Sequence, residues 1–464
     1  MLFLLALVQA TKSKRVVWLL LSNLKLGVHL NSNLTASKLK RDIGIFGASF
    51  LVLNSMIGAG IFALPGQVAL NAGLLSSWLF LVVGALFLTV VLTFAELASY
   101  YKNTGGPVLY ATDAFGPLAG FSTGWAIYLS RMTAFAANAN VMAIYIGTLD
   151  ESLASEHARW IIISLLTLGL AWVNVVGVRD GVRTMGIFTV LKIVPLLLLV
   201  ALGLQHVTTA TLIPENLFVP NELGATTLLL IYAYVGFETV AVTAGETSRP
   251  QRTLPRALVG TVLGAGLLYF LIVLVFVSVI PSSNYGEATL VDVGQYLAGS
   301  LGALAITLAA IFSIGGNLAG SMLAAPRLLF SMAEKDMLPP WLGKVHNRYA
   351  TPHNSILLMA AMALVLALSG SFVMLAVASS VVRLLGFMIC IASLPSVRRK
   401  ADDTTRAQAF RLKGGNLIPI AAFIICVWLT FQSTAESWKV VSILLLVGWL
   451  LYALEKWLSL RRSS

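Results

Sequence analysis

The sequence predicts an all-α integral membrane protein, and two observations support that prediction. Of the 464 residues, 58% are hydrophobic and only 11% are charged, and the mean hydropathy is +0.88. A soluble domain has about 45–50% apolar and about 25% charged residues. Apolar runs of about 20 residues, long enough to cross a bilayer as a helix, also recur along the whole chain. We therefore expect a polytopic helical protein with twelve transmembrane helices.

The loops between these apolar runs predict the orientation. The loops on the side of Lys40 and Arg41 hold most of the other loop lysines and arginines, whereas the 205–222 and 281–298 loops on the opposite side hold none. Since lysine and arginine collect on the cytoplasmic side of a membrane, we expect both termini in the cytoplasm. The expected spans are 43–68, 74–99, 118–148, 159–177, 184–204, 223–246, 256–281, 299–331, 354–369, 372–394, 416–434 and 437–457.

Residues 1–40 fit none of these spans. Their apolar runs, 1–8 and 16–21, are too short to cross about 30 Å of hydrocarbon. The end of the first run resembles a signal-peptide cleavage site, but no basic residue precedes that run, so we expect a cytoplasmic or interfacial extension. Two loops, 100–117 and 282–298, combine turn signals with aromatic and apolar residues, which favours short helices at the membrane surface over ordinary solvated loops.

Glycines interrupt two of the expected spans. Gly58 and Gly60 lie in the first span, and each glycine weakens a helix by roughly 1 kcal/mol relative to alanine. Irregular backbone survives at membrane depth only where it lines a cavity or is buried in protein, so the break predicts a site, with close helix packing as the alternative. A second break, at Gly236, lies five spans later. That spacing inverts the second five helices relative to the first, a plan typical of secondary transporters.

The chain therefore divides into four expected segments. The extension is 1–40, the first repeat of five helices is 41–204, the inverted second repeat is 223–394, and two further helices occupy 416–457.

Three motifs carry a resemblance to a known family. They are 58–62 with Pro65, the 95–97 segment leading to 105–107, and the long 245–257 segment, which is acidic, then basic, and contains two prolines. From about residue 38 to the C-terminus the chain resembles the amino acid–polyamine–organocation superfamily. The resemblance implies a LeuT-like fold of ten core helices plus two, and alternating access to amino acids or related amines. Within the superfamily the chain is similar to bacterial amino acid permeases and exchangers, which implies a bacterial-type inner or cell membrane.

The breaks also indicate how an α-amino acid binds. The N–H groups at the start of a half-helix suit a carboxylate, and the carbonyl groups at the end of the other half suit an ammonium group. The resemblance assigns the carboxylate to 58–60 and the amino group to the carbonyls of Met56, Tyr232 and Val235. Aromatic residues here are expected as walls of the site, although plain packing is equally common. The full expected set is Met56, Ile57, Gly58, Ala59, Gly60, Tyr128, Tyr232, Val235, Gly236 and Phe237.

Ionisable residues inside the spans are costly to bury and form a second group of candidates. The resemblance places Lys192 where sodium-coupled relatives hold a cation. Its ammonium group would then donate hydrogen bonds to carbonyls of the first helix. Lys192 is interpreted either as a proton carrier or as a purely structural residue. Glu238 matches an acid linked to proton response in some members, or is a protonated glutamate bonded between helices. Asn317 is expected to contact Lys192 or the substrate. For Arg131 and Arg383 we favour structural or gating roles over pairing with an anionic substrate side chain.

Other functional classes are disfavoured by the sequence. It contains no HExxH motif, and its two cysteines lie in apolar segments, so we expect no enzyme, metal site or cofactor. The net charge of +12 follows the distribution of a membrane protein and does not indicate nucleic-acid binding. The expected function is a secondary active amino acid transporter, either proton-coupled or an exchanger, with the amino acid, the proton and membrane lipid as partners. A polyamine or organic amine transporter and a non-pumping amino acid sensor are the alternatives, and the oligomeric state stays open.

Overall fold

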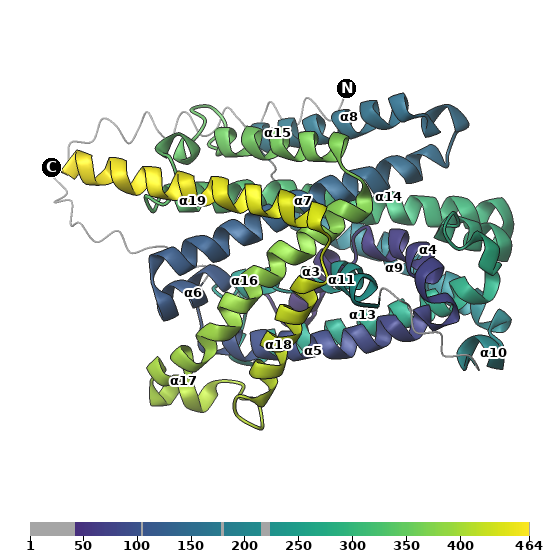
Figure 1. The fold of residues 1–464 in the computed structure, drawn as a ribbon, viewed down its shortest axis with the longest axis horizontal. Coiled ribbons are helices and arrows are strands. Elements are labelled where there is room, and N and C mark those ends of the chain that lie inside the picture. Colours follow the sequence, from purple (N-terminus) through teal and green to yellow (C-terminus); the bar gives the residue numbers. More distant parts are fainter. Residues whose placement is uncertain (1–41, 104, 178–180, 215–222, 464) are drawn as a thin grey trace, which may run out of the picture. The chain divides into compact units, whose positions relative to one another are not determined.

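The computed structural model describes residues 42–103, 105–177, 181–214 and 223–463, and these residues are almost entirely α-helical (Figure 1). The prediction of an all-α protein is confirmed. The expected extension, residues 1–40, lies outside the described residues. The longer helices, in chain order, are α3 (Ile45–Met56), α4 (Gly60–Ala72), α5 (Ser76–Tyr100), α6 (Pro107–Phe115), α7 (Pro117–Gly147), α8 (Glu156–Val176), α9 (Gly181–Gly203), α11 (Leu223–Tyr234), α13 (Pro250–Val279), α14 (Leu290–Ala333), α15 (His353–Ser369), α16 (Phe372–Lys400), α18 (Leu417–Phe431) and α19 (Ala435–Ser463).

Among the described residues, seven helical runs are long and apolar enough to span a membrane, and four shorter helices, α3, α11, α15 and α18, are also apolar. Large apolar side chains cover the outside of several helices: Leu165 and Trp172 on α8 are each 68% exposed, and Val365 on α15 is 66% exposed. Soluble proteins rarely expose apolar surface on this scale, whereas lipid-facing helices do. The total of twelve spans stays a prediction.

The first and sixth expected spans are each broken in two. The first becomes α3 and α4, and the sixth becomes α11 and the short α12 (Thr239–Val242). The eighth span contains a further irregularity. Within α14 the backbone leaves helical geometry at Ala298 and Gly299, which has φ +61°, so the short helix expected within 282–298 and the span expected from 299 are both present.

The surface helix expected within 100–117 is α6. Its limits follow from glycine and proline, because Gly106 has φ +53°, Gly116 has φ +90°, and Pro107 occupies the first helical position, where a missing N–H costs nothing. A connecting helix that the sequence analysis did not anticipate, α17 (Asp403–Gln408), follows α16.

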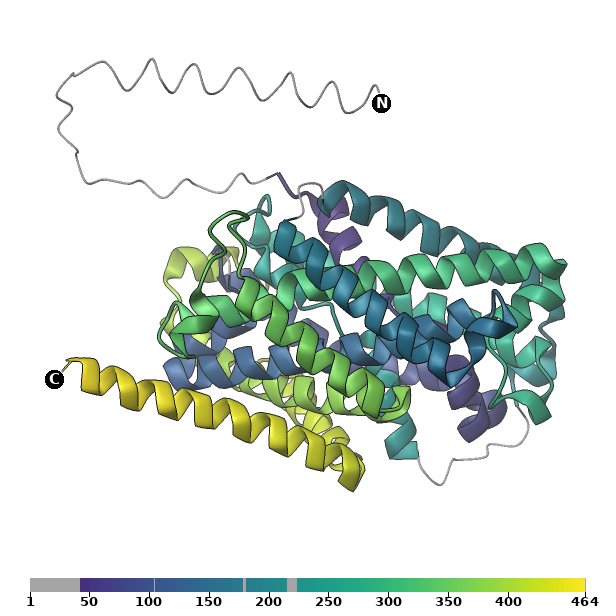
Figure 2. The same cartoon turned by 90° about the horizontal axis from the view of Figure 1, so that it is seen from above.

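The broken helices lie among longer, unbroken ones. Helices α5 and α13 pack side by side, α7 packs on both α14 and α16, and α3 and α11 lie near the middle of this arrangement (Figure 1). On the outside, α8 packs on α15, and α19 runs along α7 and α16 (Figure 2). The broken segments are therefore surrounded by other helices.

A buried carboxylate fixes the loop that follows α16. Glu96, near the end of α5, is fully buried and accepts hydrogen bonds from Arg398 Nε at 2.7 Å, from Arg398 Nη2 at 2.7 Å and from the Leu412 backbone N–H at 3.0 Å. A carboxylate paired in this bidentate way is well satisfied despite its burial. The ends of α5 and α16 are thus held together, along with the start of the loop toward α18.

Candidate functional site

The break in the first span frees backbone carbonyls for side chains of other helices. Between α3 and α4, the Ile57 carbonyl accepts hydrogen bonds from Lys192 Nζ at 2.7 Å and from Ser313 Oγ at 3.0 Å. Lys192 Nζ also donates to the Asn54 carbonyl at 3.1 Å, and its side chain is fully buried. The ammonium group is thus bound at the end of α3, where the C-terminal carbonyls carry partial negative charge.

The start of α4 has the opposite polarity. No side chain caps the helix at Ala59, and within the first turn the Phe62 N–H donates to the Ala59 carbonyl at 3.0 Å. A helix start without a side-chain cap leaves the N–H groups before that point available to a ligand. These groups and the helix dipole favour an anion. Small residues keep the backbone accessible here: a Cβ on Gly60 would lie 3.1 Å from Ala233 Cα, and one on Gly58 would lie 3.0 Å from Asn317 Nδ2.

The second break meets the first through a glycine. Between α11 and α12, Gly236 has φ +108°, and a Cβ added to it would lie 2.6 Å from the Ser55 carbonyl oxygen. A side chain is therefore excluded both by the backbone conformation and by the close approach of the two breaks. The Gly236 N–H, freed from the helix, donates to Glu238 Oε2 at 3.0 Å.

Amide and hydroxyl groups connect the two breaks from the side of α7 and α14. Asn317 Nδ2 donates to the Ser55 carbonyl at 3.1 Å, and Asn317 Oδ1 accepts from Asn138 Nδ2 at 2.8 Å. The Tyr232 hydroxyl then donates to Asn138 Oδ1 at 2.6 Å. These three hydrogen bonds connect the first break, through α14 and α7, to α11. The positions of the two breaks are therefore coupled.

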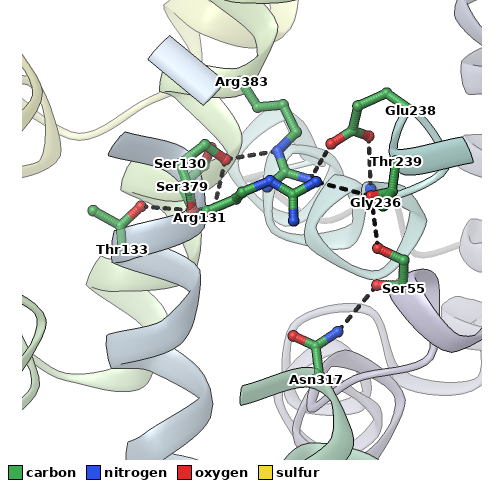
Figure 3. A network of polar contacts seen from close by, with 10 residues as sticks. All are labelled: Ser55, Ser130, Arg131, Thr133, Gly236, Glu238, Thr239, Asn317, Ser379 and Arg383. Carbon is green, nitrogen blue, oxygen red and sulfur yellow. Dashed lines mark hydrogen bonds and ion pairs between the residues drawn. The ribbon is translucent and has the colours of Figure 1, made fainter. Parts of the chain in front are cut away.

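Two arginines lie on the other side of the second break, as Figure 3 shows. Arg383 Nη1 forms an ion pair with Glu238 Oε1 at 3.0 Å, and Arg383 Nε donates to Ser130 Oγ at 2.6 Å. Arg131 Nη2 donates to Thr239 Oγ1 at 2.9 Å, and that hydroxyl lies 3.0 Å from Ser55 Oγ. Helices α7 and α16 are thereby joined to both breaks.

These groups surround a cavity of about 180 Å³. A dry cavity of about 150 Å³ is known to admit benzene, so this one has room for a small organic molecule. Ten of the residues expected from the sequence line it: Met56, Gly58, Ala59, Gly60, Arg131, Tyr232, Val235, Gly236, Asn317 and Arg383.

Two expected members of the site, Lys192 and Glu238, do not line the cavity but form hydrogen bonds with residues that do. Lys192 donates to the Asn54 carbonyl, and Glu238 accepts from the Gly236 N–H. Ile57 contributes its carbonyl to Lys192, while its side chain is fully buried.

The other two expected residues pack elsewhere. The ring of Phe237 lies 5.7 Å from that of Phe87 and 5.4 Å from that of Phe94. Tyr128 directs its hydroxyl to Met362 Sδ at 3.7 Å, and its ring lies 5.2 Å from that of Trp125. Both side chains are fully buried in aromatic packing.

The sequence reasoning missed several lining residues. The most informative are Ser55 and Thr239, whose hydroxyls lie 3.0 Å apart. The sequence feature that could have identified them is a small polar side chain in an otherwise apolar helix, close to a glycine break. The remaining lining residues are Leu51, Asn54, Ala134, Asn138, Gly316, Gly320, Ser321, Leu323 and Ala324.

The fold and the site define a class of protein. Apolar helices, two of them broken, meet around a small polar cavity with free backbone groups of both polarities, which is the construction of a membrane permease for a small dipolar solute. A family model described as "Amino acid permease" matches residues 43–451, and the chain belongs to that family. The predicted membership of the amino acid–polyamine–organocation superfamily is thereby confirmed, and the protein is an integral membrane protein.

Individual relatives are consistent with this family. The chain is 29% identical over 389 residues to the serine/threonine exchanger SteT of Bacillus subtilis, covering 81% of this chain and 87% of SteT. It is 26% identical over 444 residues to the branched-chain amino acid permease BcaP of Bacillus subtilis, covering 90% and 92%. It is also 26% identical over 387 residues to the human large neutral amino acids transporter small subunit 2, covering 79% and 72%. The family and these relatives are permeases and transporters, as expected, and not enzymes.

Proposed function

We propose that this protein is a secondary active transporter that moves an α-amino acid across the membrane by alternating access. The observation that carries the proposal is the meeting of the two helix breaks at Gly236 and Ser55, beside a cavity with an uncapped helix start. The names of the relatives, which exchange or transport serine, threonine, branched-chain or large neutral amino acids, support an amino acid as the solute.

In this proposal the substrate binds through backbone groups. Its carboxylate accepts hydrogen bonds from the free N–H groups around Ala59 and Gly60, and its ammonium group binds carbonyls at the end of α11, around Tyr232 and Val235. Because the contacts are with backbone, the common part of every amino acid is recognised, and the side chain is left to face α7 and α14.

The position of the cavity indicates from which side of the membrane the site is accessible. It extends along α3 back to Leu51 and along α14 forward to Leu323 and Ala324, toward the side where α3 begins. On the opposite side, the Tyr145 hydroxyl donates to the Phe62 carbonyl at 2.9 Å, and Thr148 Oγ1 lies 3.3 Å from Thr307 Oγ1. These contacts close α4 and α14 against α7. With the cytoplasmic N-terminus expected from the lysine and arginine distribution, this arrangement faces inward.

The proposal includes the two inverted repeats, 41–204 and 223–394, with α18 and α19 outside them. Lys192 acts on the first repeat by holding the carbonyls of Asn54 and Ile57 in place of a bound cation. Release of its proton would free those carbonyls and loosen α3, which makes Lys192 the residue for proton coupling. An exchanger needs no proton release from Lys192, since binding of a second substrate molecule on the other side of the membrane returns the transporter to its first conformation.

Uptake into proteoliposomes containing the purified full chain tests the proposal. A panel of labelled amino acids is measured with and without internal substrate and with and without a pH gradient. We expect saturable uptake of at least one amino acid, stimulated by one of these two conditions. Uptake of polyamines in place of amino acids would contradict the proposal, and so would binding of an amino acid without any transport.

A further inference from the structure

We infer that the substrate carries an anionic side chain, as glutamate and aspartate do, and that Arg131 binds its charge. The inference rests on the proposed function and names the substrate class of the same cavity. It starts from Arg131, which lies on α7, lines the cavity and reaches the second break at Thr239 (Figure 3).

The guanidinium of Arg131 has donors to spare. It carries five N–H groups, and among the described residues its hydrogen-bond partner is Thr239 Oγ1, at 2.9 Å. The group forms no ion pair within the part of the chain that the structure describes, although its side chain lies inside a cavity between apolar helices. The side chain is half-buried, and a cation that apolar helices partly remove from water is stabilised by a counter-charge.

The nearest acid supplies only part of that counter-charge, because the single carboxylate of Glu238 faces both Arg131 and Arg383. Both carboxylate oxygens of Glu238 are engaged, Oε1 with Arg383 at 3.0 Å and Oε2 with the Gly236 N–H at 3.0 Å. Arg383 and Glu238 neutralise each other, so the charge of Arg131 is left over. The residues that line the cavity include two arginines and no aspartate or glutamate. An amino acid with a neutral side chain is zwitterionic and adds no net charge, whereas a second carboxylate compensates Arg131.

A purely mechanical role would not call for a cation. Arg131 does connect α7 to Thr239 and, through that hydroxyl, to Ser55. A neutral amide can donate the same hydrogen bond without the desolvation cost of a guanidinium. The planar fork of arginine is, in contrast, the group best suited to bidentate contact with a carboxylate. Arg131 is therefore the residue that determines specificity for the side chain, while the helix breaks bind the common part of the amino acid.

The experiment compares acids with their amides on the purified full chain. Ligand-induced thermal stabilisation is measured in detergent for L-glutamate, L-aspartate, L-glutamine and L-asparagine, which removes any dependence on coupling ion or internal substrate. We expect the acid of at least one pair to bind at least tenfold more tightly than its amide. Arg131→Gln should abolish that preference, and Arg131→Lys should retain part of it. Arg327→Gln is the matched control, because Arg327 is an exposed arginine of α14 outside the cavity, and it should leave the preference unchanged.

The outcomes separate the inference from the proposed function. Equal or tighter binding of the amides, or of other neutral amino acids, by the unmodified protein would overturn the inference and leave amino acid transport standing. Binding of no amino acid at all, together with absence of uptake into proteoliposomes, would overturn the proposed function itself. A uniform loss of affinity for acids and amides in Arg131→Gln would assign Arg131 to gating and also overturn the inference.

Discussion

Replacing Gly236 by alanine tests whether the contact between the two breaks is essential. The new Cβ would lie 2.6 Å from the Ser55 carbonyl oxygen, whereas ordinary contact begins at 3.4 Å, so one break must move by about 0.8 Å, the difference of the two distances. Alanine at φ +108° adds backbone strain of about 1–3 kcal/mol, and overpacking adds about 1–3 kcal/mol, which gives a total of about 2–6 kcal/mol.

Two measurements on the same preparation show this effect. Thermal unfolding in detergent should shift several degrees downward, and substrate binding should weaken at least tenfold, because the carbonyls at the end of α11 no longer face the start of α4. Gly264→Ala is the control, since no heavy atom lies within 4 Å of a Cβ at that helical position of α13, and it should be neutral or slightly stabilising. Wild-type unfolding and binding in Gly236→Ala would refute the reasoning.

Three further variants test other parts of the account. Lys192→Ala leaves the Asn54 carbonyl without this donor, at about 1–3 kcal/mol, while the Ile57 carbonyl keeps Ser313. The variant should abolish uptake into proteoliposomes, and full uptake would exclude a role for Lys192. Glu238→Gln removes the counter-ion of the buried Arg383 and should lower stability by about 3 kcal/mol in thermal unfolding, so wild-type unfolding would contradict the importance of this ion pair. Glu96→Gln breaks the buried ion pair with Arg398 and should lower stability by about 3 kcal/mol in thermal unfolding. Asp403→Asn is the control, because it removes an exposed ion pair with Arg406 and should cause no measurable change. Equal effects of the two variants would contradict the account of the loop after α16.

The helices and their breaks could be predicted from the sequence, because neighbouring residues along the chain determine them. Apolar runs fix the helices, and glycine at 58, 60 and 236 weakens them where a site needs free backbone groups. The short helix α6 and the first part of α14 were also expected; glycine and proline limit α6, whereas Thr289 and Gly299 limit the first part of α14.

Contacts between distant helices were not readable, because periodicity sets which residues share a face but not which helix that face meets. The pair of Glu238 and Arg383 joins positions 145 residues apart, and the sequence analysis treated the two residues separately. For the same reason Phe237 and Tyr128 were expected as walls of the substrate site, although the structure packs both into aromatic clusters. Ser55 and Thr239 were missed because a single hydroxyl in an apolar helix is also common in plain helix packing.

A structure of the full chain with its substrate bound is the most direct test of the central claim, that the two breaks together form the substrate site. The account predicts the substrate carboxylate at the N–H groups of Ala59 and Gly60 and its ammonium group at the carbonyls of Tyr232 and Val235. A substrate bound away from both breaks, with Gly236 still against Ser55, would contradict it.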